Sequence, residues 1–137
     1  MRRGFALLLA ALPAVAAITS AYAQERIPAG LWQFTAQAEP QQGAQAQIGA
    51  NFTNCIDPMR SVPLDPSLSC RNQWMNRRGT AVTWATTCTT QQGTFQSQGV
   101  AQYRGGTMAG RLTTEVPVLG GQVVQRISGR YLGPCRR

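Results

Sequence analysis

Apolar and polar residues alternate along most of this chain, with the two-residue period of β-strands that bury one face. The alternation is clear over residues 32–37 and again over residues 48–53. Between residues 55 and 69 three prolines interrupt it. Proline cannot donate to a strand ladder, so this part is predicted to be a Pro-rich loop. From residue 70 onward the alternation is regular.

Dipeptides that contain glycine mark the hairpin turns in the second half of the chain. Gly105-Gly106 and Gly120-Gly121 are strong turn signals, and Gln92-Gly93 is a third. Pairing outward from Gly105-Gly106 sets apolar residues opposite apolar ones and polar opposite polar. A slip of one residue would turn every side chain to the other face, so the register of this hairpin is well specified.

The pattern as a whole predicts an all-β, disulfide-stapled domain: an antiparallel meander of about seven strands that forms a curved sheet or open half-barrel, with one Pro-rich loop. In such a meander the first and last strands point the same way, so a simple closed up-and-down barrel is not expected. The turns also predict individual cross-strand pairs, namely Trp84–Ala101, Tyr103–Met108 and Arg111–Arg130.

Four cysteines are available for cross-linking: Cys55, Cys70, Cys88 and Cys135. Cys-x-x-x-Trp, a turn and Trp-x-x-x-Cys follow one another symmetrically, which sets Trp74 opposite Trp84. The same register brings Cys70 opposite Cys88, within disulfide range. That pairing leaves Cys55 to bond Cys135. The alternative connectivity joins Cys55 to Cys70 and Cys88 to Cys135.

The N-terminal segment has the three parts of a secretory signal peptide. Arg2 and Arg3 precede an apolar run over residues 5–18, and Ala21-Tyr22-Ala23 supplies a small-x-small cleavage site. The apolar run is shorter than the roughly 18 residues of a spanning helix, although an uncleaved anchor is the competing interpretation. We expect cleavage after Ala23, a single β-sheet domain over residues 24–137 with no transmembrane span, and a periplasmic or secreted protein.

Thirteen basic residues, all of them arginine, stand against five acidic ones, which gives a formal net charge of +8. This charge serves solubility, or it attracts an anionic partner such as an envelope lipid, a polysaccharide or an envelope protein. An exported protein rarely meets nucleic acid, so that partner is not expected. Four arginines fall on the polar face and are candidates for an anion-binding stripe: Arg104, Arg111, Arg126 and Arg130.

A second candidate surface is an apolar groove on the concave face of the sheet. The aromatic residues assigned to it are Trp74, Trp84, Tyr103 and Tyr131. The chain has no His and no Cys-x-x-Cys pair, so neither a metal site nor a cofactor is expected. Catalysis is not expected either: Asp57 and Asp65 share one loop, but Asp beside Pro is more typical of a cap or turn.

Gly30-Leu31-Trp32, the four spaced cysteines and the ending 129–135 together resemble a family of small exported bacterial proteins known as domain of unknown function 3617. The resemblance covers nearly all of the chain after the signal peptide. It implies an exported β-protein and carries no assigned activity. Because the chain has no His and only five carboxylate side chains, we predict a non-enzymatic periplasmic binding or interaction protein of the cell envelope, with an anionic or apolar ligand. The alternative is an unrecognised enzyme that acts on envelope components.

Overall fold

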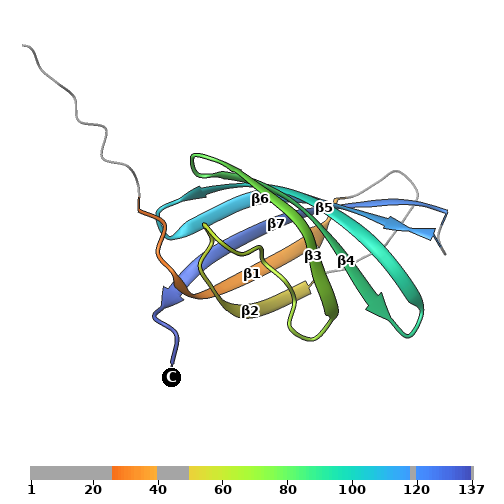
Figure 1. Cartoon of the computed structure of the whole chain (residues 1–137), viewed down its shortest axis with the longest axis horizontal. Helices are drawn as coiled ribbons and strands as arrows, with labels where there is room; N and C mark the ends of the chain where they lie inside the picture. The colour runs from red at the N-terminus through yellow and green to blue at the C-terminus, as the bar shows by residue number, and fades with distance from the viewer. Residues whose placement is uncertain (1–25, 40–49, 118–119, 137) are drawn as a thin grey trace, which may run out of the picture.

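A computed structural model describes residues 26–39, 50–117 and 120–136 as one seven-stranded antiparallel sheet. The predicted signal peptide lies outside the described residues. The strands are β1 (Gly30–Ala38), β2 (Ala50–Ile56), β3 (Ser69–Arg78), β4 (Ala81–Thr90), β5 (Gly93–Arg104), β6 (Thr107–Val116) and β7 (Gly121–Gly133). The sheet curls into an open half-barrel (Figure 1), which confirms the predicted fold class. Within the described residues, no helix is long and apolar enough to cross a membrane.

The strand order is β2-β1-β7-β6-β5-β4-β3, so β1 lies inside the sheet. β3 to β7 form the expected meander, but β1 pairs antiparallel with β7, with Trp32 opposite Tyr131. The prediction that the first and last strands point the same way is therefore wrong. The reason lies in the Pro-rich segment 57–68. It carries the chain from β2 at one edge of the sheet to β3 at the other, instead of pairing the two strands.

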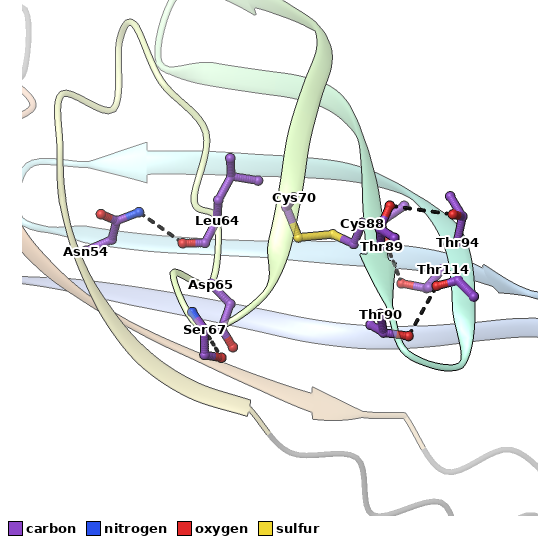
Figure 2. The surroundings of a disulfide bond; sticks show 12 residues. Asn54, Leu64, Asp65, Ser67, Cys70, Cys88, Thr89, Thr90, Thr94 and Thr114 are labelled. Atoms are coloured by element: carbon purple, nitrogen blue, oxygen red, sulfur yellow. Dashed lines mark hydrogen bonds between the residues drawn. A yellow bond between two sulfur atoms is a disulfide. The ribbon is translucent and has the colours of Figure 1, made fainter.

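The Pro-rich loop covers the open side of the half-barrel between the two edge strands (Figure 1). Pro58, Val62 and Pro63 are buried within the molecule. The side-chain amide of Asn54 on β2 donates to the carbonyl of Leu64 over 2.9 Å, which holds the loop to that edge (Figure 2). The loop therefore acts as a side wall where the sheet has none.

Of the three hairpins whose turns were predicted from glycine dipeptides, only β5–β6 has the predicted register. Tyr103 lies opposite Met108, as predicted. Trp84 lies opposite Gly99 instead of Ala101, because β4 and β5 turn at Gln91-Gln92, one residue earlier than expected. A shift by an even number of residues keeps every side chain on its predicted face.

The β6–β7 hairpin is shifted further. The predicted partner of Arg111 was Arg130, but Arg111 lies opposite Arg126. The amide of Gly120 donates to the carbonyl of Pro117 over 3.1 Å, so the turn starts at Pro117 instead of being centred on the two glycines. Arg111 still has an arginine opposite it, but a different one.

The β3–β4 hairpin contains both a confirmed and a wrong prediction. Cys70 lies opposite Cys88 and bonds to it, and Cys55 bonds to Cys135, which is the predicted connectivity. A β-bulge between Asn72 and Trp74 then changes the register. Trp74 is consequently opposite Ala85 and 48% exposed, so its predicted pairing with Trp84 is wrong.

Candidate ligand-binding cavity

The hydrophobic core fills one end of the half-barrel. Trp32 and Phe34 on β1 are fully buried, and the Trp32 indole meets the Tyr103 ring edge-on at 5.5 Å between centroids. Met108 and Val82 pack into the same cluster. This end includes the β5–β6 turn and the start of β1. Because the buried side chains of this cluster come from several strands, they close this end.

The other end of the half-barrel holds a cavity of about 650 Å³. Exposed residues at its margin, Gln92 and Thr94 in the β4–β5 hairpin and Pro117 after β6, place its mouth at the end of the sheet where these turns lie. Leu68 at the end of the Pro-rich loop is a further lining residue and is 40% exposed. Ligand pockets commonly measure about 300–1,000 Å³, so this cavity has the size of a small-molecule site.

Side-chain size explains why the barrel is filled at one end and hollow at the other. Phe34 on β1 lies opposite Phe52 on β2, with ring centroids 5.4 Å apart. Two residues further on, Ala36 lies opposite Ala50, and both line the cavity. Replacing a pair of phenyl rings by a pair of methyl groups at the next inward position leaves this part of the interior empty.

Most of the cavity wall is apolar. Its inward side chains come from the strands and from the Pro-rich loop, and they include Phe52, Pro63, Leu64, Trp84, Phe95, Leu112, Val116 and Ile127. The Cys70–Cys88 disulfide belongs to the same wall and ties edge strand β3 to β4 (Figure 2). An apolar molecule in the cavity would therefore bury surface against this wall.

Three buried hydroxyl groups form a row across this wall. Thr86 lies opposite Ser97, which in turn lies opposite Thr114, on three successive strands. The Ser97 and Thr114 oxygens share a hydrogen bond of 2.8 Å in which either hydroxyl can donate. Gln125 on β7 adds a buried amide to the lining. A largely apolar cavity with a few converging polar groups is the usual form of a ligand site.

Of the four aromatic residues assigned to an apolar groove, the structure places Trp84 in the cavity wall. Tyr103 is 1% exposed and lies in the core at the closed end. Tyr131 packs against Trp32 with ring centroids 5.9 Å apart. Trp74 lies on edge strand β3 and is half-exposed. The structure therefore does not bring these four residues together in one groove.

Burial affects both the hydrogen bonding and the pKa of the Tyr103 phenol. Its hydroxyl has no hydrogen-bond partner in the part of the chain that the structure describes. Burial also raises the pKa of this group well above its usual range, because the phenolate would lose its hydration. Tyr103 is therefore a neutral core residue and does not line the cavity.

The four arginines of the predicted stripe lie on exposed positions of β5, β6 and β7. Arg111 and Arg126 are direct neighbours, and both approach Oε1 of Glu39, at 3.1 Å and 3.7 Å. Arg130 donates from Nε to the side-chain oxygen of Gln33 over 2.8 Å. Arg104 lies two strands from Arg130, with Thr107 between them. Glu39 thus neutralises part of the stripe, and it is a residue that the sequence analysis did not connect with the arginines.

Asp57 and Asp65 each organise their own turn. The Asp57 carboxylate accepts from the amide of Met59 over 3.1 Å, and Oδ1 of Asp65 accepts from the amide and hydroxyl of Ser67 over 2.9 Å and 2.7 Å. These are the Asx-turn contacts expected of Asp in loops. No cluster of three or more metal-ligating side chains exists among residues 26–39, 50–117 and 120–136.

Sequence reasoning missed Ser97, Thr114 and Gln125 as members of a site. A signal for them does exist, because each occupies an inward position where the alternation calls for an apolar residue. Polar side chains at core positions of a strand need a specific partner. Their shared location became evident only once the order and register of β5, β6 and β7 were known.

Comparison with known proteins gives a single result. A family model described as "Protein of unknown function (DUF3617)" matches residues 27–135, nearly all of the described chain. No curated protein and no solved structure matches this chain. The match confirms the resemblance inferred from the sequence, and it supplies no functional residues.

Proposed function

From the geometry of this chain, which belongs to the DUF3617 family of unknown function, we propose that it is a non-enzymatic binding protein for a small apolar ligand. The observation that carries this proposal is the cavity of about 650 Å³ at the open end of the half-barrel. Its apolar wall supplies affinity by burying ligand surface, and its buried hydroxyl row supplies orientation.

Two features support a cavity that keeps its shape without a ligand. The Cys70–Cys88 disulfide fixes the edge strand that borders the opening. The Pro-rich loop is held by Asn54 on one side and by the Asp57 and Asp65 turns within itself. A preformed site avoids the cost of ordering loops on binding, which favours affinity.

The proposed location is the periplasm. Two disulfides are typical of proteins that mature outside the reducing cytoplasm, and the N-terminal sequence has the parts of a signal peptide. Protein recovered from an osmotic-shock fraction should begin at Gln24. An N-terminus at Met1 in that fraction would contradict cleavage after Ala23.

Other functions have weaker support. An enzyme acting on envelope components would need a nucleophile, a base and an orienting group, and both Asp57 and Asp65 are engaged in turns. The hypothesis that the arginine stripe binds an anionic envelope lipid or polysaccharide has less support, because Glu39 forms ion pairs with both Arg111 and Arg126. The cavity is the feature with the most specific geometry.

Trp84 offers a direct test, because it is 1% exposed and lines the cavity. The variant Trp74→Phe removes the half-exposed indole that would add background emission. Titration of this variant with decanol should shift or quench tryptophan emission in a saturable way. Emission that stays constant up to the solubility limit of decanol would contradict the proposed function.

A further inference from the structure

The buried hydroxyl row lies well inside the cavity. The pairs Thr90–Gly93 and Cys88–Phe95 separate the Thr86–Ser97 pair from the β4–β5 turn. Thr86, Ser97 and Thr114 are 4%, 5% and 9% exposed. A ligand group that reaches this row has therefore left bulk water.

The Ser97–Thr114 pair retains hydrogen-bonding capacity toward a ligand. Each hydroxyl has one hydrogen and two lone pairs. The bond of 2.8 Å between them uses one hydrogen and one lone pair. One hydrogen and several lone pairs remain, so the pair can both donate to and accept from a neighbouring group such as a hydroxyl.

The cavity provides no positive charge for an anionic group. Asp65 is the one ionisable side chain in the lining, and it is negative. Every arginine within the described residues is exposed, and none of them lines the cavity. An isolated carboxylate or phosphate placed against the hydroxyl row would lose its hydration with no cation to replace it.

From this distribution of charge we infer that the ligand is an uncharged amphiphile, with an apolar chain and a hydroxyl or carbonyl group that binds the Ser97–Thr114 pair. The inference rests on the proposed function and specifies the ligand class. The chain lies along Phe52 and Phe95, and the neutral polar group points inward. A fatty acid must instead keep its carboxylate at the mouth and forgo the contact with the hydroxyl row.

Calorimetric titration of the intact, oxidised protein with decanol and with decanoate at neutral pH tests this inference. The two ligands share a chain length and differ in the charge of the polar group. Decanol should bind about tenfold more tightly than decanoate, the difference expected from one hydrogen bond gained and no charge buried.

A double variant, Ser97→Ala with Thr114→Val, removes both hydroxyl groups and keeps the strands. Because both partners of the hydrogen bond are replaced by apolar groups, folding should be little affected. Its affinity for decanol should fall to about that of decanoate. The matched control is Gln98→Ala with Thr113→Val, the directly opposed pair on the outer face, which should leave both affinities unchanged.

The outcomes separate the two claims. If decanoate binds as tightly as decanol or more tightly, the inferred ligand class is wrong while the proposed binding function stands. An unchanged decanol affinity in the Ser97→Ala/Thr114→Val variant also overturns the inference. If neither ligand binds the wild-type protein, the proposed function itself fails. The wild-type comparison remains decisive even where a variant does not fold.

Discussion

The indole of Trp84 on β4 covers Gly99, the residue directly opposite it on β5. A Cβ added to Gly99 would overlap three atoms of the indole. The absence of a side chain at residue 99 thus lets the Trp84 indole pack against β5, where it forms part of the cavity wall. One glycine therefore sets the position of the largest aromatic side chain in the cavity.

Substitution Gly99→Ala should destabilise the protein. The added methyl group forces the indole or the β5 backbone to move, and such overpacking typically costs about 1–3 kcal/mol. Urea unfolding measures the effect. Gly121→Ala is the control, because a Cβ there meets nothing within 4 Å. Equal stability of the Gly99→Ala variant and the wild type would show that the indole has room to shift freely.

The two disulfides should differ in their contribution to stability. Cys55–Cys135 closes a sequence separation of 80 residues, and Cys70–Cys88 closes 18. In the chain-entropy model, their removal costs about 4.5 and about 3 kcal/mol respectively. Urea unfolding of the two Cys→Ala double variants measures both values. A larger loss for the Cys70–Cys88 variant would contradict this ranking.

The same pair of variants separates stability from binding. Cys70–Cys88 lines the cavity, whereas neither Cys55 nor Cys135 does so. Removal of Cys70–Cys88 should therefore weaken decanol binding in conditions where both variants remain folded. Removal of Cys55–Cys135 should leave the affinity of the folded fraction close to that of the wild type.

Tyr103→Phe should be neutral or stabilising at neutral pH. The phenolic hydroxyl is buried with no hydrogen-bond partner among the described residues, so its removal relieves a desolvation cost of about 1 kcal/mol or more. Differential unfolding in urea measures the change. A loss of more than about 1 kcal/mol would mean that the hydroxyl has a partner that stabilises the fold.

Alkaline pH gives a second readout for Tyr103. Burial raises the pKa of this phenol in the folded state above its ordinary value of 10.0. Ionisation of Tyr103 therefore does not affect stability below about pH 10, the unfolded pKa, and the free energy of unfolding falls as pH rises above it. The wild type should lose about 1.4 kcal/mol per pH unit more than the Tyr103→Phe variant in that range. Parallel pH profiles would contradict this linkage.

Local patterns predicted the strands and their faces well. Alternation identified the strands, and the positions of Cys70 and Cys88 predicted a disulfide that the structure confirms. Alternation fixes which face a residue takes but not which residue lies opposite it. This is why the β4–β5 register could shift by two residues and the β6–β7 register by four without exposing the core.

Long-range features could not be predicted from the sequence. The pairing of β1 with β7 depends on the path of the Pro-rich loop, for which no short-range signal exists. The bulge at Asn72/Trp74 contains no glycine, so the sequence offers no signal for it, yet it turns Trp74 to the outer face. The cavity depends on which inward positions lie at the open end, so of the four predicted groove residues Trp84 belongs to its lining.

We propose that the half-barrel cavity binds an apolar ligand, and a variant whose cavity is blocked by a large side chain tests this claim. Val123 lines the cavity opposite Thr114, whereas Val124 lies on the other face of β7. Calorimetric titration with decanol should show binding by the wild type and by Val124→Trp. Val123→Trp, whose indole fills the cavity, should lower the affinity by about tenfold or more. Equal affinity of the Val123→Trp and Val124→Trp variants would place the ligand elsewhere and contradict the claim.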